Sequence, residues 1–409
     1  MILTRLKESL YDRLPLSTKL AIKELVFHFT GTPTEIGKRP YVLVFDERIP
    51  TPDRDAGSLR MMRILSIVRE RWDVVFVPFT NSGARVLTET GITAADVAEY
   101  KRLVQNSQLR SVIVCRPTMA ELFTQHVRKL NSHARVIFDT VDVHFVRLQR
   151  ECELTGDPQI CADAERNRLT EAGLARVADV IWCASIDDER YLKNEVPACE
   201  SVVIPTLHEL HEDDGLPFNE RSGLLFVGSF AHRPNADAVR YFLREMFPLL
   251  RQELPDITLN VVGAHPPEDI SSHASEHVRV LGYVPDLGPY LRSSRVLVAP
   301  LRYGGAGTKG KVGEALAHGL PVVTTSIGAE GFGLTSGVDT MIADEARPFA
   351  KAVSQVYTDE STWRRLRTNG LRLIEKGFTP AAVAAKVFAS IEPDSAKCSL
   401  RSKARVFTA

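Results

Sequence analysis

Residues 296–328 have the sequence VLVAPLRYGGAGTKGKVGEALAHGLPVVTTSIG, and this stretch decides the class of the fold. It begins with the apolar run Val296–Leu301, which is typical of a strand buried in a parallel sheet. Four glycines come next: Gly304, Gly305, Gly307 and Gly310. Apolar residues at near-helical spacing over 312–320 then predict a helix, and Pro321–Thr325 predicts another strand. The order of strand, glycine turn, helix and strand indicates a doubly wound α/β domain.

The glycine turn is a predicted site for an anion. A backbone without side chains can approach a ligand closely, and the first N–H groups of a helix have no partner within the helix. The positive end of the helix dipole lies at the same place, and Lys309 and Lys311 stand beside it. A diphosphate fits this combination best.

Three alternatives for the turn remain open. GAGTKG satisfies the dinucleotide fingerprint G-x-G-x-x-G, but Thr325 and Ser326 stand where an acidic residue should end the next strand. Residues 305–311 satisfy G-x-x-x-x-G-K, but Val312 replaces the Ser or Thr that would hold Mg²⁺ in a P-loop. The third alternative is a glycine-rich connection that binds no ligand.

The same stretch resembles the donor site of family-4 glycosyltransferases, which have the GT-B fold. The resemblance rests on the apolar strand, the glycine-rich loop with its lysine, and Gly-Glu-Ala-Leu-Ala-x-Gly-x-Pro-Val-Val over 313–323. In that family a glutamate here holds the nucleotide ribose, and a second glutamate eight residues earlier meets the donor sugar. Glu314 matches the first, whereas Ala306 stands at the second. The resemblance therefore implies nucleotide binding and leaves sugar recognition open.

The rest of the chain predicts two similar α/β halves. The first begins at Tyr41 and the second restarts at Leu224, and the resemblance covers about 41–391. We expect two Rossmann-like doubly wound domains that face a cleft (GT-B), with an N-terminal helical extension. The expected divisions are 1–40, helical extension and linker; 41–205, acceptor-side domain; 206–222, linker; 223–378, nucleotide-sugar domain; 379–391, a helix packing back toward the first domain; and 392–409, a polar tail.

Several elements outside the glycine turn are also predicted. Strands are expected at 41–45, 74–77, 111–115, 136–138, 180–183, 201–204, 224–228, 258–262 and 278–281. Helices are expected near 93–106, 117–130, 160–177, 236–250, 348–374 and 380–391.

The resemblance implies roles for further residues. Gly57 and Ser58 would belong to the acceptor-side loop that faces the donor phosphates. Gly228 and Ser229 end the first strand of the second half, where many relatives have an Arg directly after the glycine and a Lys five residues later. Here Arg233 would either supply the charge or lie on the surface. Gly305, Gly307, Thr308 and Gly310 would complete the donor site, with Glu314 on the ribose. His144, with Lys309 and Lys311, would be catalytic.

Composition excludes some partners and leaves others open. Lys+Arg and Asp+Glu both total 51, so net charge does not favour nucleic acid. The six cysteines form no C-x-x-C pair, and several lie in apolar strand or helix context, which fits buried thiols in a reducing compartment. No run of 18 apolar residues and no signal peptide is evident, so we expect a cytoplasmic protein. Residues 1–30 predict helices that pack on the first domain or, alternatively, form a basic amphipathic contact with the inner face of the membrane.

Metal-binding patterns in the sequence are weak. Asp53-x-Asp55 matches the metal motif of GT-A enzymes, but it lies in a loop before a glycine instead of at a buried strand end. HELHE at 208–212 and HASEH at 273–277 lack the long helix that would align zinc ligands. We therefore expect no metal and no cofactor.

The resemblance implies a glycosyltransferase that works without a metal and retains anomeric configuration. It would move a sugar from a nucleotide-sugar donor to a glycan, lipid-linked or other hydroxyl acceptor in glycan or polysaccharide synthesis. A nucleotide-sugar epimerase on the same fold and a non-catalytic nucleotide-binding subunit remain as alternatives, the latter because of Ala306.

Overall fold

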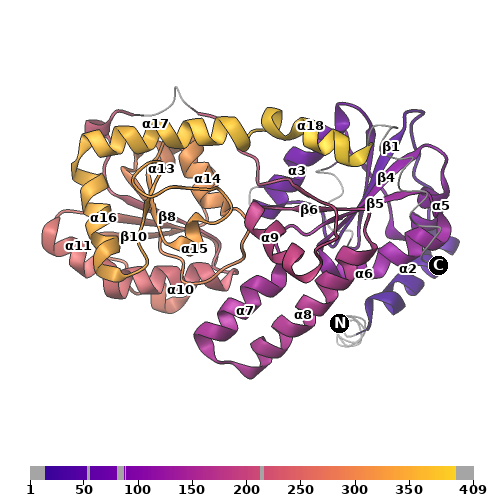
Figure 1. Ribbon diagram of the computed structural model, residues 1–409, viewed down its shortest axis with the longest axis horizontal. Helices are drawn as coiled ribbons and strands as arrows, with labels where there is room; N and C mark the ends of the chain where they lie inside the picture. The colour runs from indigo at the N-terminus through magenta and orange to yellow at the C-terminus, as the bar shows by residue number, and fades with distance from the viewer. Residues whose placement is uncertain (1–13, 53–55, 81–86, 88, 212–215, 393–409) are drawn as a thin grey trace.

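The computed structural model describes residues 14–52, 56–80, 87, 89–211 and 216–392 (Figure 1). The predictions for residues 1–13, Asp53, Asp55 and the tail from 393 lie outside the described residues. Two α/β domains lie side by side, with the N-terminal half of the chain in one and the C-terminal half in the other (Figure 1). The predicted class of two Rossmann-like domains with an N-terminal helix is confirmed.

The first domain is built on a parallel sheet. Its strands follow the order β3-β2-β1-β4-β5-β6-β7. Their bounds are β1 Tyr41–Asp46, β2 Asp73–Pro78, β3 Thr93–Ala94, β4 Leu109–Cys115, β5 Arg135–Asp139, β6 Val180–Cys183 and β7 Ser201–Val203. All six residues of β1 are buried, as expected for a central strand that has helices on both faces.

Helices cover both faces of this sheet. They are α2 Leu16–Thr30, α3 Ala56–Arg69, the 3₁₀ turn η1 Val97–Glu99, α5 Tyr100–Gln105, α6 Arg116–Leu130, α7 His144–Thr155, α8 Pro158–Val177 and α9 Ile186–Glu195. The helix predicted over 93–106 is wrong at its start, because Thr93 and Ala94 pair with β2 as the edge strand. A two-residue strand is too short to leave a periodic pattern in the sequence.

The second domain repeats the architecture with a sheet of order β10-β9-β8-β11-β12-β13. Its strands are β8 Leu224–Val227, β9 Leu259–Val262, β10 Val278–Gly282, β11 Val296–Ala299, β12 Val322–Thr324 and β13 Met341–Ile342. Its helices are η2 Phe218–Glu220, α10 Arg233–Tyr241, the π-helix η3 Phe242–Met246, α11 Phe247–Glu253, α12 Glu268–Ser271, α13 Gly288–Ser293, α14 Gly310–Ala317, α15 Ser326–Ala329, α16 Ala346–Thr358 and α17 Glu360–Gly377.

Two predicted helices of this domain are interrupted. The helix expected over 236–250 contains the π-helix η3, which lies directly before Pro248, where the ring displaces the preceding turn. The helix expected over 348–374 is two helices, because Asp359 ends α16 and its side chain caps α17 by accepting from Ser361 N.

The last helix crosses back to the first domain. α18 (Pro380–Ile391) extends beyond α17 and lies against α3 (Figure 1). Trp182 Nε1 donates to Ser390 Oγ at 2.9 Å, and Ser111 Oγ donates to Ile391 O at 2.9 Å. The chain therefore passes between the domains twice.

One pair of cysteines is oxidised, which the sequence analysis did not predict. Cys152 and Cys161 form a disulfide that joins α7 to α8. The two helices are antiparallel neighbours because Gly156 ends α7 in the left-handed conformation and turns the chain back. A C-x₈-C spacing carries no such signal by itself. Among the described residues, no helix combines the length and apolar character needed to cross a bilayer.

Candidate active site

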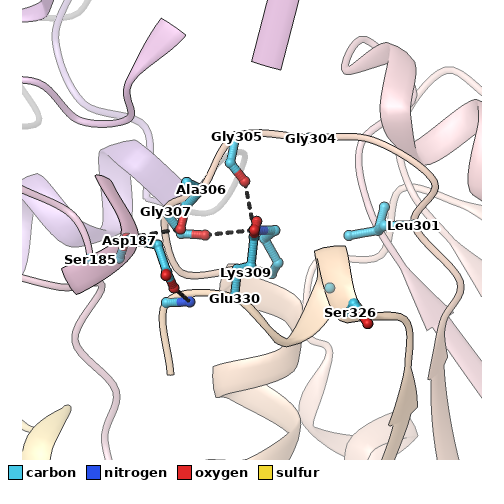
Figure 2. A network of polar contacts seen from close by, with 12 residues as sticks. Ser185, Asp187, Leu301, Gly304, Gly305, Ala306, Gly307, Lys309, Ser326 and Glu330 are labelled. Atoms are coloured by element: carbon cyan, nitrogen blue, oxygen red, sulfur yellow. Dashed lines mark hydrogen bonds and ion pairs between the residues drawn. The ribbon is translucent and has the colours of Figure 1, made fainter. Parts of the chain in front are cut away.

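The glycine turn lies at the carboxyl end of β11 and leads into α14, as the sequence predicts. Its residues reach across to the first domain, where Ser185 Oγ donates to Ala306 O at 2.8 Å. Figure 2 shows this contact and the backbone of the turn around Lys309. The turn is therefore held between the domains and not exposed on one of them.

Lys311 is in the first turn of α14 and points toward β8. Its ammonium donates to Asn235 Oδ1 and lies 4.7 Å from the centroid of the Phe226 ring. Burial, followed by the charge of Lys309, lowers the pKa of Lys311 to about 7. Among the described residues no carboxylate is recorded within ion-pair distance of Lys311, so an anionic ligand would relieve the cost of burying this charge.

Asn235 is a site residue that the sequence analysis missed. Its Nδ2 donates to Ser229 O at 2.7 Å while its Oδ1 accepts from Lys311. A Cβ at Gly228 would lie 2.6 Å from Asn235 Cγ, so only glycine allows this packing. Asn235 thus joins the turn after β8, with Gly228 and Ser229, to the start of α14.

Lys309 has a different position from Lys311. Its Nζ donates to Gly305 O at 2.6 Å and to Gly307 O at 2.9 Å, so it closes the glycine turn on itself (Figure 2). Glu330 Oε2 is 3.8 Å from the same nitrogen. Burial lowers the pKa of Lys309, and the Glu330 carboxylate opposes this effect. Lys309 shapes the turn as well as adding charge to it.

Glu330 links the glycine turn to the first domain. Arg150 on α7 donates to both oxygens of Glu330 at 2.7 Å and to Gly304 O at 3.0 Å. A bidentate pair of this kind fixes direction as well as distance. Arg150 therefore holds Glu330 beneath Lys309 and secures the beginning of the turn.

Glu314 lies one helical turn after the start of α14. Its Oε2 accepts from Nδ1 of the buried His208 at 3.0 Å, and its Oε1 is 3.8 Å from His318 Nδ1. Burial favours the neutral acid, but the hydrogen bond from His208 and the nearby imidazoles hold the pKa of Glu314 below its usual value. The side chain is 23% exposed, so a ligand can reach the carboxylate.

Ala306 is fully buried in an apolar contact between the domains. It packs with Val143, Phe145 and Val146 at the start of α7. A glutamate at this position would have to place its charge among these side chains, which is costly. The position where the resembled family has the glutamate that meets the donor sugar is therefore part of an apolar contact between the two domains.

His144 begins α7 opposite the glycine turn. Its Nε2 is 3.0 Å from Asp142 Oδ1, and a Cβ at Gly305 would lie 3.3 Å from Asp142 Oδ2. Burial lowers the pKa of His144, but the Asp142 carboxylate more than compensates and the pKa is raised overall. Val141, directly before this pair, has φ 64°, which is strained for a β-branched residue. This strain lies beside the glycine turn, where function could require it.

Comparisons with known proteins agree with this geometry. Residues 221–359 match the family model described as Glycosyl transferases group 1. A Klebsiella pneumoniae protein named "Uncharacterized 44.6 kDa protein in cps region" is 26% identical over 194 residues, or 45% of this chain and 49% of that protein. The chain thus spans about half the length of this curated relative.

Solved structures extend the likeness to both domains. Sucrose-phosphate synthase from Thermosynechococcus elongatus matches with a TM-score of 0.64 at 16% identity, covering 85% of this chain and 97% of that one. The Anabaena HepE protein, in complex with UDP and glucose, matches with a TM-score of 0.65 at 13% identity, covering 86% and 99%. These likenesses show that the fold is GT-B.

Helix α3 of the first domain approaches the start of α14 in the second domain. A Cβ at Gly310 would lie 2.6 Å from Ala56 Cβ, which brings the helix start containing Gly57 and Ser58 to the glycine turn. Thr308 Oγ1 accepts from Thr206 N at 3.1 Å, a second contact between the domains. The predicted acceptor-side residues and the donor turn therefore face one another.

Arg233, a predicted site residue, points away from the glycine turn. Its guanidinium pairs with Glu151 of α7 at 3.0 Å and its side chain is 59% exposed. The positive charge near Ser229 belongs instead to Lys311. Lys311 donates to Asn235, and Asn235 donates to Ser229 O. Sequence spacing alone could not show which of Arg233 and Asn235 faces the glycine turn, because both lie in the first turn of α10.

Proposed function

We propose that this protein is a glycosyltransferase that moves a sugar from a nucleotide-sugar donor to a hydroxyl acceptor without a metal ion. The observation that carries the proposal is Lys311, a buried cation at the start of α14 whose recorded partners are an amide oxygen and an aromatic ring. A diphosphate there would accept from the helix N–H groups and from Lys311. Nothing else in the described site would neutralise this charge.

Each neighbouring residue then has a role in the proposed reaction. Glu314 accepts from the ribose hydroxyls, and Lys309 keeps the glycine turn in the shape that meets the phosphates. As the sugar–oxygen bond breaks, negative charge grows on the leaving diphosphate, and the preorganised cations and N–H groups stabilise it. The departing phosphate oxygen takes the proton of the incoming hydroxyl on the same face, which gives retention.

His144 and Asp142 would line the sugar end of the donor site. Ala306 offers no carboxylate to a sugar hydroxyl, so the polar groups opposite Gly305 are candidates for this role. A His144–Asp142 pair can donate to one hydroxyl and accept from another. This part of the proposal rests on the position of the pair beside the turn.

The acceptor is proposed to be a glycan or lipid-linked hydroxyl compound, in glycan or polysaccharide synthesis at the cytoplasmic face of a membrane. Helix α2 exposes large apolar side chains, including Leu25 at 61% and Phe29 at 76%. Exposed apolar side chains of this kind can lie in the lipid interface beside the membrane-bound acceptor. Sedimentation with vesicles, comparing the wild type with Leu25→Ser/Phe29→Ser, tests this contact.

A donor panel with purified protein tests the activity. Nucleoside diphosphate release is measured for UDP-, GDP-, ADP-, CDP- and dTDP-sugars, with and without simple glycoside acceptors. Release that depends on an acceptor supports the proposal. Turnover of the sugar without an acceptor favours an epimerase, and binding of a nucleoside diphosphate without turnover of any donor favours the accessory subunit, for which Ala306 is the motivating residue.

A further inference from the structure

Three potential metal ligands meet where the segment between the domains touches α14. His211 lies in that segment, Glu314 lies in α14, and His318 directly follows α14. One ligand atom of each lies within 4.8 Å of the others. The histidines come from HELHE and from the glycine-turn stretch, so the fold assembles a cluster that neither motif forms locally.

The surrounding hydrogen bonds orient these ligands. His318 Nδ1 is 2.9 Å from Glu314 O, so this nitrogen carries the proton and Nε2 keeps its lone pair. The buried His208 donates from Nδ1 to Glu314 Oε2 at 3.0 Å, which turns the carboxylate. The backbone of His211 is held as well, since its N–H donates to Ala317 O at 3.0 Å. Protein metal sites commonly show such partners behind their ligands.

The ligand set selects the metal. Two imidazoles and one carboxylate suit Zn²⁺ and related transition metals, whereas Mg²⁺ and Ca²⁺ prefer oxygen ligands. Zn²⁺ bonds of about 2.0–2.2 Å require the ligand atoms to approach to roughly 3.3 Å. His211 and His318 are stacked with ring centroids 4.0 Å apart, so a rotation of the partly exposed His211 side chain brings its nitrogen to the metal.

We propose that His211, Glu314 and His318 form a Zn²⁺ site in which water completes the coordination. The site would be inhibitory and not catalytic, because the metal uses the carboxylate that we propose for the ribose. The proposal that Zn²⁺ binds depends only on the cluster of His211, Glu314 and His318. The exclusion of nucleotide by metal rests on the proposed function.

Metal binding is tested on full-length protein stripped with EDTA. Calorimetry with Zn²⁺ and visible absorption with Co²⁺ should show one equivalent bound, with the bands of four-coordinate cobalt. His211→Ala and His318→Gln should each weaken Zn²⁺ binding at least tenfold. His273→Ala, an exposed histidine elsewhere in the same domain, should leave it unchanged. Circular dichroism checks that the variants are folded. Absence of stoichiometric binding, or binding unaffected in folded His211→Ala, overturns the site.

A competition experiment separates this inference from the proposed function. The nucleoside diphosphate that binds tightest is titrated with and without saturating Zn²⁺. Affinity should fall at least tenfold in the wild type and stay constant in His211→Ala. If Zn²⁺ binds but nucleotide affinity does not change, the exclusion is refuted. If Zn²⁺ binds and no nucleotide binds at all, the function fails while the metal site stands.

Discussion

Lys311→Met removes the buried charge while keeping most of the side-chain volume, and it should uncouple nucleotide binding from proton uptake. Because the pKa of Lys311 is lowered to about 7, roughly nine-tenths of its side chains are neutral in the free protein at pH 8. A bound diphosphate favours the charged ammonium. Binding at pH 8 should therefore take up roughly 0.9 proton at this residue, plus a contribution from Lys309.

The loss of affinity follows from the same contact. A hydrogen bond to a charged group contributes about 1.5–3 kcal/mol, so the variant should bind nucleoside diphosphate about 10- to 150-fold more weakly. Calorimetry in two buffers of different ionisation enthalpy measures both quantities. Lys351→Met, on an exposed face of α16, is the matched control and should change neither. Equal proton uptake and affinity in wild type and Lys311→Met would refute the phosphate role.

Lys311→Met should stabilise the ligand-free protein although it weakens nucleotide binding. Between about pH 7 and the ordinary lysine pKa, the unfolded chain binds more protons at Lys311 than the folded chain does. The free energy of unfolding therefore rises with pH in that window, by at most about 1.4 kcal/mol per unit, and the penalty is complete below pH 7. Lys311→Met should flatten this slope and raise the melting temperature at pH 6. A melting temperature lowered at pH 6 would contradict the explanation.

Three other predictions test the rest of the site. Glu314→Gln should lower transfer about tenfold or more at nearly unchanged melting temperature, because charge-assisted bonds to the ribose are lost; equal activity in steady-state assays would remove Glu314 from the site. Activity should survive exhaustive EDTA treatment, and a loss restored by Mn²⁺ or Mg²⁺ would reopen the question of Asp53 and Asp55. Arg150→Ala should weaken nucleoside diphosphate binding several-fold through the glycine turn, and by no more in combination with Glu330→Gln; additive losses in calorimetry would show that the two side chains act separately.

The sequence predicted what is local and periodic. Strand β11, the glycine turn, α14 and β12 follow one another in the chain, and each leaves a pattern within a few residues. The position of Glu314 one helical turn from the anion site follows from helix geometry alone. The two-domain fold could be predicted for the same reason, since each half repeats alternating apolar strands and amphipathic helices.

The features that were missed depend on contacts between distant residues. Asn235 contacts Lys311 only because the turn after β8 and the start of α14 are neighbours in space, and Arg150 meets Glu330 only when the domains face each other. The burial of Ala306 likewise needs α7 of the other domain. The disulfide of Cys152 depends on a helix reversal, which residue spacing does not indicate. No periodicity within one segment can indicate which residue of another segment it will contact.

The two chain crossings between the domains have a consequence for the order of events at the site. They touch each other, because His208 N of the first crossing donates to Phe378 O of the second at 2.7 Å. A joint of this kind acts as a pivot. His208 also contacts Glu314, so in the proposed reaction the nucleoside would bind next to this joint, whereas Ala306 and Val143 meet at a different contact between the domains. In a rotation, displacement grows with distance from the axis. We therefore expect the domains to move apart more at the sugar end of the proposed site than at the nucleoside end. The sugar product could then leave before the nucleotide does.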